Sequence, residues 1–409
     1  MRTETVIPRI DPAAFTAPAA VKRLQSLAVV VGGIAAVLWV IGAVMAPSYF
    51  LRSFLVGWVY WMGVSLGCLA LSMLHHMTHG DWGIVLRRVM EAAARTLPLL
   101  AVLLAVFIGA LYFIGWDHLY SWASPAAAND EILQKKEAYL NVPAWVLRQI
   151  LYFAIWLGLA FTLSRMSLRQ DRADDPGITR RMQVVAAPGL ILYVLSVTFA
   201  SVDWLMSLEP HWFSTIYGVY LVGSQGLAAL AFLIAIAVFL SRREPMSQVL
   251  QPRHFHDWGK LLLAFVMLWA YFCFSQFLIT WAGNLPEEIH WFEHRLHHGW
   301  QYVALALVLF HFALPFALLL SRPLKRNAGR LIMVATVMLI MRWVDLVFQT
   351  EPSFEEQSLA FGWMYLVAPL AIGGLWLFYF LRQLQGRPLL PVSDPFLPEA
   401  IAKEALAHE

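Results

Sequence analysis

The chain has 409 residues, of which 60% are hydrophobic and only 13% are charged. Soluble domains carry about 25% charged residues, so this composition excludes an ordinary soluble protein. The net charge of +3 is small and follows from the uneven placement of lysine and arginine described below. It therefore gives no indication of nucleic-acid binding.

Ten apolar stretches follow one another along the chain, each about long enough to cross a bilayer as a helix. They span about residues 24–45, 52–75, 97–116, 143–164, 184–205, 213–240, 258–281, 298–320, 331–349 and 360–382. The sequence therefore predicts an all-α polytopic membrane protein with about ten transmembrane helices.

Lysine and arginine are divided unequally between the two sets of connecting segments. If the N-terminus is inside, 23 of the 29 lie in cytoplasmic segments, five lie in outer segments, and Arg342 lies within a span. The positive-inside rule then predicts that both termini are cytoplasmic. The polar first 20 residues lead directly into a full-length span, which is not typical of a cleaved signal peptide.

Cysteine and histidine give no pattern typical of a bound redox centre. Cys68 and Cys273 lie in different spans, and the chain has no C-x-x-C-H motif and no cysteine cluster. His311 lies well inside a span but lacks the companion that a membrane haem needs. His290 and His294 have an i,i+4 spacing that suits a metal, yet no further ligand type is clearly placed. We expect no metal, no covalently bound cofactor, and no haem or iron–sulfur ligands in this chain.

Two parts of the chain carry the same short motifs in the same order. The pattern V-D-x5-E-P occurs at 202–210 and again at 344–352, and HGDWG at 79–83 resembles HDWG at 256–259. The shared order indicates that the second to fifth spans repeat as the sixth to ninth. Each unit has an even number of spans, so the two copies have the same orientation.

The repeat predicts two four-helix bundles side by side with one flanking helix before and one after them. The predicted segments are a cytoplasmic tail (1–23), a first flanking helix (24–51), a first bundle (52–210), a second bundle (211–352), a last flanking helix (353–386) and a cytoplasmic tail (387–409). For the proline-rich part of the last tail, 387–398, we expect an unstructured end, with a docking strap as the alternative.

The stretch SVDWLMSLEPHWFSTIYG, at 201–218, places two acids and a histidine where two spans meet. Asp203 and Glu209 are six residues apart, so on a helix they face different sides. Pro210 indicates that the helix stops near Glu209. The acids could exchange protons at the outer membrane face, with His211 as a relay. Equally, they could cap helix ends in a tight turn.

The second copy of the motif adds a cation within the span. Asp345 and Glu351 repeat the two acids, and Arg342 precedes Asp345 by one helical turn. A charge near the middle of the bilayer is costly unless it is paired, so we expect an ion pair between Arg342 and Asp345. The pair could fix helix packing, or it could line a polar cavity for protons or a ligand head group.

A third segment, QFLITWAGNLPEEIHWFEHR at 276–295, is typical of a helix start. Asn284 is the expected cap, a proline follows, and Glu287 and Glu288 would lie at the positive end of the helix dipole. The chain also has 18 tryptophans and 26 phenylalanines. Most suit membrane belts and packing, although aromatic clefts between helices also suit a quinone ring.

Three stretches carry a resemblance to a known family: SVDWLMSLEPHWFSTIYGVY, FSQFLITWAGNLPEE and MRWVDLVFQTEP. They resemble the ActF-type membrane subunit of bacterial alternative complex III, a quinol:cytochrome c oxidoreductase, within the NrfD-like (polysulfide-reductase-like) superfamily of membrane subunits. The match runs over the fifth to ninth spans, and the ten-span pattern agrees. The residues TWAG at 280–283 are less aromatic than the family pattern expected before Asn284.

The resemblance implies a subunit of a respiratory quinol:acceptor oxidoreductase in the bacterial inner membrane. Such a subunit would contribute to interaction with menaquinol or ubiquinol, to proton transfer, or to both. It would lack a complete active site of its own. The implied partners are a sister ten-span (ActC-like) subunit, which holds the principal quinol site in that family, an iron–sulfur/molybdopterin-like subunit, multihaem and monohaem cytochromes c, and membrane lipid.

The family motifs, carried over residue by residue, give two sets of candidates and no certain catalytic residue. The proton-transfer candidates are Asp203, Glu209, His211, Arg342, Asp345 and Glu351, and the quinone-pocket candidates are Trp204, His211, Asn284 and Glu287. Two other functions stay open. Internal repeats and intramembrane charges also occur in proton-coupled secondary transporters, and a purely structural scaffold of a complex needs no ligand.

Overall fold

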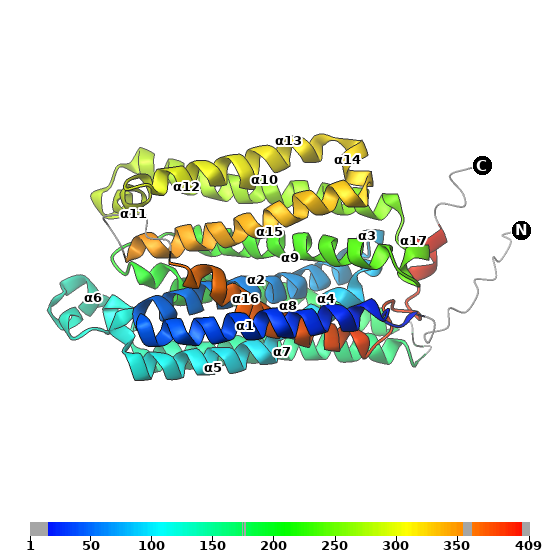
Figure 1. Ribbon diagram of the computed structural model, residues 1–409, viewed down its shortest axis with the longest axis horizontal. Helices are drawn as coiled ribbons and strands as arrows, with labels where there is room; N and C mark the ends of the chain where they lie inside the picture. The colour runs from blue at the N-terminus through cyan, green and yellow to red at the C-terminus, as the bar shows by residue number, and fades with distance from the viewer. Residues whose placement is uncertain (1–14, 174, 176, 355–361, 403–409) are drawn as a thin grey trace, which may run out of the picture.

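The apolar stretches form long helices that run together along one axis of the molecule, as the computed structural model shows (Figure 1). The structure describes residues 15–173, 175, 177–354 and 362–402. Within these ranges no strand occurs, and ten helical spans are long and apolar enough to cross a membrane. The predicted all-α polytopic fold with ten transmembrane helices is confirmed.

Six spans are single helices: α1 (Ala20–Met45), α2 (Pro47–Thr78), α7 (Val142–Gln170), α9 (Tyr217–Ser241), α10 (Pro252–Gly283) and α16 (Met364–Gln385). The other four are composite. One joins α4 (Arg87–Ala94) to α5 (Leu97–Ile114), and one joins α12 (Trp300–Ala306) through a π-helical segment (Leu307–Ala313) to α13 (Leu314–Leu320). In the last two, α8 (Gly177–Trp204) and α15 (Ala328–Thr350) each continue into a 3-10 turn, at Met206–Leu208 and Glu351–Ser353.

Short helices mark the two ends of the bundle. At one end lie α6 (Glu131–Lys136) and α11 (Pro286–Leu296), together with 3-10 turns at Trp116–His118, Ser121–Ala123, Pro125–Asn129 and Met206–Leu208. At the other end lie α3 (Asp81–Ile84), α14 (Arg322–Arg326), α17 (Leu397–Ala402) and a 3-10 turn at Met246–Gln248. We call these the α11 end and the α17 end. They correspond to the predicted outer and cytoplasmic sides.

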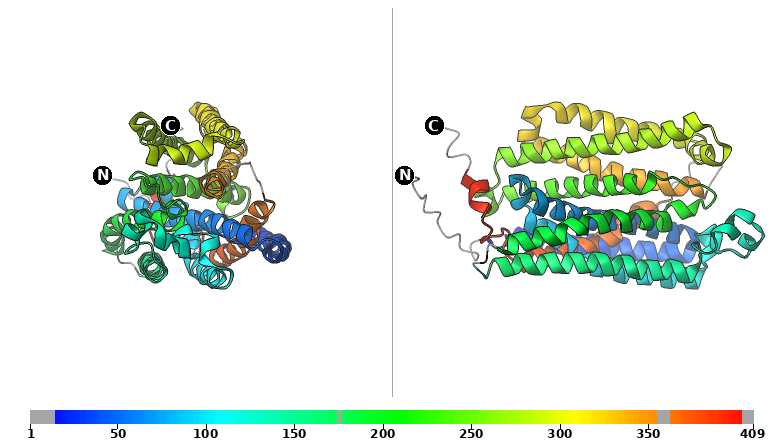
Figure 2. Two further views of the ribbon diagram at one scale, coloured as in Figure 1. Left: turned by 90° about the vertical axis from the view of Figure 1, so that its left-hand side faces the viewer. Right: turned by 180° about the vertical axis from the view of Figure 1, so that it is seen from behind.

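The centre of the molecule is formed by α2 and α9, the first helices of the two predicted repeat units. They pack against each other, and each also packs against α8. Their approach is close, because a Cβ at Gly67 would lie 2.2 Å from the carbonyl oxygen of Gln225. An end-on view places α1 and the α10–α13 pair at the periphery (Figure 2). These peripheral helices keep apolar side chains exposed, as a lipid-facing surface requires.

Helix pairing is similar in the two predicted units. In the first, α2 contacts α5 and α8, and in the second, α9 contacts α10 and α15. The flanking helices α1 and α16 pack on each other, and a Cβ at Gly32 would lie 2.7 Å from the Cα of Gly374. Because α2 and α9 share one core, the boundary between the two bundles stays a prediction.

One predicted helix start differs from the structure. Asn284 is not the cap that begins α11. It ends α10 in the left-handed conformation, with φ of 47°, and its N–H donates to the carbonyl of Thr280. Asparagine tolerates this conformation at a helix end. The helix α11 begins at Pro286, with Glu287 and Glu288 in its first turn as predicted.

The expectation of an unstructured end at 387–398 is wrong, and the structure has the alternative, a docking strap, which extends to residue 402. This segment, which we call the strap, crosses the α17 end. Its side chains Leu389, Leu390 and Leu397 are buried. The N–H of Leu389 donates to the carbonyl of Phe15, at 2.8 Å. The leucines supply apolar burial and the prolines limit the freedom of the unfolded segment, so this segment can fold against the bundle.

Candidate functional site

All four acids of the repeated motif accept a hydrogen bond from an arginine. The pairs are Asp203 with Arg148 at 2.7 Å, Glu209 with Arg295 at 2.8 Å, Glu351 with Arg52 at 3.5 Å, and Asp345 with Arg342. The predicted pair of Arg342 and Asp345 is confirmed. The other three arginines come from segments far away in the sequence, so only the fold brings them to their acids.

Asp203 lies in the last turn of α8 and is fully buried. Arg148 of α7 donates to both carboxylate oxygens through Nε and Nη2, at 2.7–3.1 Å. Tyr152 donates its hydroxyl at 2.9 Å, and the side-chain amide of Gln149 donates at 3.3 Å. Four side-chain donor groups surround this carboxylate, so its contacts fix the end of α8 against α7.

Asp345 has a less crowded environment and lies at the end of a hydrogen-bond chain. Besides Arg342, Asp345 accepts from the hydroxyl of Tyr220 in α9, at 2.5 Å. The amide of Gln349 donates to the Tyr220 oxygen at 3.1 Å, and the Tyr217 hydroxyl donates to the amide oxygen of Gln349 at 3.3 Å. The polar chain therefore runs from Tyr217 through α15 and α9 to the buried ion pair.

A cavity of about 90 Å³ lies at the start of this chain, toward the α11 end. Its wall is aromatic with a few polar groups, which is typical of sites for flat organic ligands. The residues that line it are Tyr217, Tyr220, Cys273, Gln276, Trp291, Phe292, Phe348 and Gln349, from α9, α10, α11 and α15. Hydroxyl and amide groups there could bind the oxygens of a quinone or quinol.

His311 is the histidine that the sequence places well inside a span. It lies in the π-helical segment, is fully buried, and stacks on Trp269 with ring centroids 4.2 Å apart. Among the described residues, neither of its ring nitrogens has a hydrogen-bond partner. His311 is thus held by packing against an aromatic ring, and no second histidine in the described part of the chain faces it as a haem would require.

Glu209 and Glu351 tie the two copies of the motif to their surroundings. Glu209 also accepts from the hydroxyl of Ser353, at 2.7 Å, while Arg295 donates to the backbone carbonyl of Gln349 at 2.9 Å. Burial lowers the pKa of Arg295, which Glu209 partly offsets. Glu351 is fully buried and accepts from the hydroxyl of Tyr365 as well as from Arg52. These contacts connect the first repeat to the end of α15.

The four quinone-pocket candidates do not lie together. Trp204 is buried in the first repeat, where its indole N–H donates to Gln149 at 2.8 Å. His211 is half-exposed and contacts the Asp130 carboxylate, at 2.6 Å. Asn284 and Glu287 are exposed at the α11 end. None of the four lines the aromatic cavity.

The residues of this cavity were missed by sequence reasoning, and only part of the signal was available. Tyr217 and Tyr220 lie at the end of the stretch SVDWLMSLEPHWFSTIYGVY, in an i,i+3 spacing that predicts a shared helix face. Gln349 lies inside the second motif, between Asp345 and Glu351. Their mutual contact depends on α9 packing against α15, which no short motif encodes.

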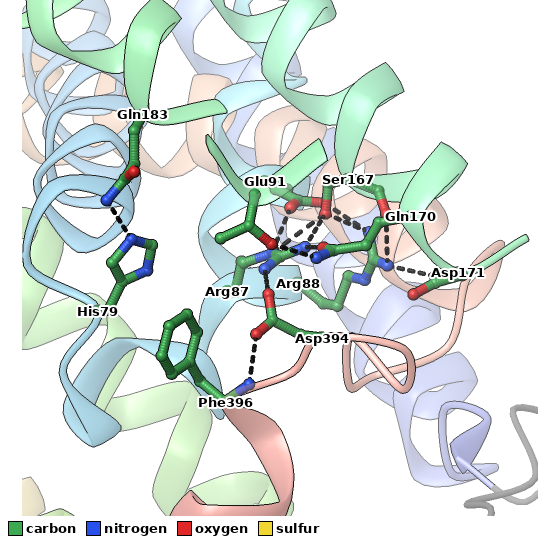
Figure 3. Close-up of polar contacts among 11 residues, drawn as sticks. His79, Arg87, Arg88, Glu91, Ser167, Gln170, Asp171, Gln183, Asp394 and Phe396 are labelled. Atoms are coloured by element: carbon green, nitrogen blue, oxygen red, sulfur yellow. Dashed lines mark hydrogen bonds and ion pairs between the residues drawn. The ribbon is translucent and has the colours of Figure 1, made fainter. Parts of the chain in front are cut away.

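A second buried polar cluster occupies the α17 end (Figure 3). Arg87 donates to Asp394 of the strap at 2.5 Å and to Gln170 at 2.6 Å, and Arg88 donates to Glu91 at 2.9 Å and to Asp171. Ser167 accepts from both arginines. The cluster joins α4, α7 and the strap, and its cations are all matched by acids. This arrangement is typical of a structural network.

No three histidine, cysteine, aspartate or glutamate side chains come together as a metal site in the described part of the chain. A scan against protein-family models finds no matching family, and a search among curated proteins finds no match. The function is therefore inferred from the motifs and from the geometry of the two polar networks.

Proposed function

We propose that this chain is an integral membrane subunit of a respiratory quinol:acceptor oxidoreductase. In this proposal, the aromatic cavity at the α11 end interacts with quinol or quinone, and the chain from Tyr217 to Asp345 takes part in proton transfer. The observation that carries the proposal is this hydrogen-bond chain, which joins a small aromatic cavity to a carboxylate inside the membrane. The three family-like motifs support it.

In such a complex, the steps of quinol oxidation are divided among several subunits. Oxidation of a quinol to a quinone releases two electrons and two protons. The electrons would pass to iron–sulfur and c-type haem subunits, because the chain has no cysteine cluster or C-x-x-C-H motif for such centres. The tyrosine hydroxyls can both donate and accept, and Gln349 holds two of them in fixed directions. Asp345 supplies a carboxylate that can bind a proton.

The proposal includes a location and a set of partners. It places the chain in the bacterial inner membrane, with both termini cytoplasmic as the basic residues predict. The partners are a sister ten-span subunit, an iron–sulfur/molybdopterin-like subunit and cytochromes c. A structural scaffold would use the same acid–arginine pairs, but it would not need the cavity. A proton-coupled transporter would need neither redox partners nor quinol.

Purification separates these functions. The full chain, tagged and extracted in mild detergent, should co-elute with c-type haem absorption and with iron–sulfur and sister membrane subunits in mass spectra. In that complex, Asp345→Asn should lower quinol turnover at least tenfold, because general acid–base groups contribute about 10²–10⁴ in rate. Glu131→Gln, on the exposed face of α6, is the matched control and should leave turnover unchanged.

Two outcomes would contradict the proposal in different ways. An intact complex in which Asp345→Asn turns over quinol normally would favour the scaffold. A colourless chain that elutes alone would favour the transporter, and substrate uptake in vesicles would then be measured.

A further inference from the structure

A second cavity lies directly beside the first acidic motif, at the α11 end. It has a volume of about 340 Å³. Two segments form it: the end of α6 with the residues after it, and the end of α8 with the turn that follows. The lining residues are Lys135, Lys136, Ala138, Tyr139, Leu140, Val202, Met206, Ser207, Pro210, Trp212 and Phe213.

The charge of this cavity is positive, because its lining includes two lysines and no acid. Lys136 is half-buried and donates to the carbonyl of Pro210 at 2.6 Å, which fixes the ammonium at the cavity and leaves two further N–H donors. Lys135 pairs with Glu131 at 2.8 Å, but both side chains are more than 70% exposed. Such an exposed pair is weak and readily exchanged for another anion.

Trp212 closes one wall of this cavity. It is 3% exposed, and its ring stacks on that of Trp291 with centroids 4.8 Å apart. Packing therefore fixes this wall, and the charged donors that the cavity offers to an oxyanion are the two lysine ammonium groups.

An apolar track leads from this cavity along the outside of α8. Val202 lines the cavity, and Phe199, Leu195 and Leu192 follow at spacings of three and four residues, so they share one helix face. Their exposures are 51%, 52% and 44%. The track runs from the end of a membrane span toward its middle, in the direction that a lipid acyl chain takes.

We propose that this cavity binds an anionic phospholipid, with its phosphate at Lys135 and Lys136 and one acyl chain along the α8 track. Free phosphate would use the lysines but not the track. A zwitterionic lipid would bring its own ammonium group beside the two lysines and would bind less tightly. The site is separate from the aromatic cavity, so the proposal does not depend on quinol chemistry.

The test is lipid binding to the purified full chain, followed by native mass spectrometry. Phosphatidylglycerol and phosphatidylcholine with the same acyl chains are titrated separately, and inorganic phosphate is added in a third arm. We expect phosphatidylglycerol to bind more tightly than phosphatidylcholine. Each lysine near a lipid head group contributes about 1 kcal/mol, so Lys136→Gln should weaken phosphatidylglycerol binding roughly fivefold, and Lys136→Arg should restore it.

Lys260→Gln is the matched control, since Lys260 is a half-exposed lysine at the α17 end and should leave this affinity unchanged. Equal affinity for the two lipids, with no effect of Lys135→Gln and Lys136→Gln together, would overturn the proposal. Displacement of phosphatidylglycerol by millimolar inorganic phosphate would also overturn it, because the site would then select a soluble anion.

Discussion

Arg342 and Asp345 lie one turn apart in α15 and are almost fully buried, at 2% and 1% exposure. Removing one member of a buried pair leaves a charge without a counter-ion and costs about 3–5 kcal/mol. We therefore expect Arg342→Met to lower the thermal midpoint of the purified chain clearly. Replacing both members, Arg342→Met with Asp345→Leu, should recover most of that loss, because no lone charge is left.

The control for this pair is Arg330→Met, since Arg330 is exposed at the start of the same helix. It should leave the midpoint unchanged. If the double variant is no more stable than Arg342→Met alone, the arginine stabilises the fold through some other contact. The same double variant should abolish any proton transfer through Asp345.

Local spacing explains which ion pairs could be predicted from the sequence. Arg342 and Asp345 are three residues apart on one helix, so their contact follows from helix geometry alone. Arg148 and Asp203 are 55 residues apart and meet only because α7 packs against α8. Arg148 is visible in the sequence as a charge near the start of the fourth span, but its partner is not.

The short helix α6 depends on a single cap. Asp130 accepts from the backbone N–H groups of Ile132 and Leu133, at 2.9 and 3.1 Å, and its other oxygen contacts His211. Asp130→Ala should increase hydrogen exchange across α6, measured by mass spectrometry at constant pH. Asp130→Asn should leave exchange nearly unchanged, because asparagine is an equally good cap. Equal protection in both variants would contradict the role of the cap.

The pH dependence of this cap follows from the same contacts. The backbone N–H of Leu133, followed by His211, lowers the pKa of Asp130 below its ordinary value of about 4. A carboxyl with a lowered folded pKa stabilises above its unfolded pKa and loses this effect as the pH falls through the folded value. Protection of α6, corrected for intrinsic exchange, should therefore decrease as the pH falls below 4.

The C-terminal strap depends on one carboxylate at the α17 end. Asp394 is 4% exposed and pairs with the buried Arg87. We expect Asp394→Ala to lower the thermal midpoint and to expose the strap to limited proteolysis, because a hydrogen bond to a charged group contributes about 1.5–3 kcal/mol. Asp394→Asn keeps an acceptor and should have a smaller effect. If both variants are cleaved as slowly as the unaltered chain, Leu389 and Leu390 hold the strap without Asp394.

At the level of elements, hydrophobicity predicted the spans well, and local caps were harder to assign. Ten apolar runs became ten spans because a buried or lipid-facing helix needs little besides length and apolar side chains. Asn284 ends one helix instead of starting the next, since asparagine suits both positions. The strap was only the second choice for 387–398, because its leucines give no helical or strand periodicity and its docking depends on Arg87, about 300 residues earlier.

The whole molecule contains two polar networks at opposite ends of an apolar bundle. At the α11 end lie the aromatic cavity, the lysine-lined cavity and three of the acid–arginine pairs. At the α17 end, the strap covers the buried arginines of α4. With both cavities at one end and the strap at the other, the orientation of the bundle decides which side of the membrane each one faces.

The distribution of lysine and arginine predicts that the α11 end faces outward, and cysteine labelling in intact cells tests this. Glu131→Cys, on the exposed face of α6, should react with a membrane-impermeant maleimide without lysis. Arg326→Cys, exposed in α14 at the α17 end, should react only after the membrane is opened. The unaltered chain is the background control, because Cys68 is buried and Cys273 is half-buried within its span. The reverse pattern would place the aromatic cavity inside and would exclude the proposed proton release from it to the outer side.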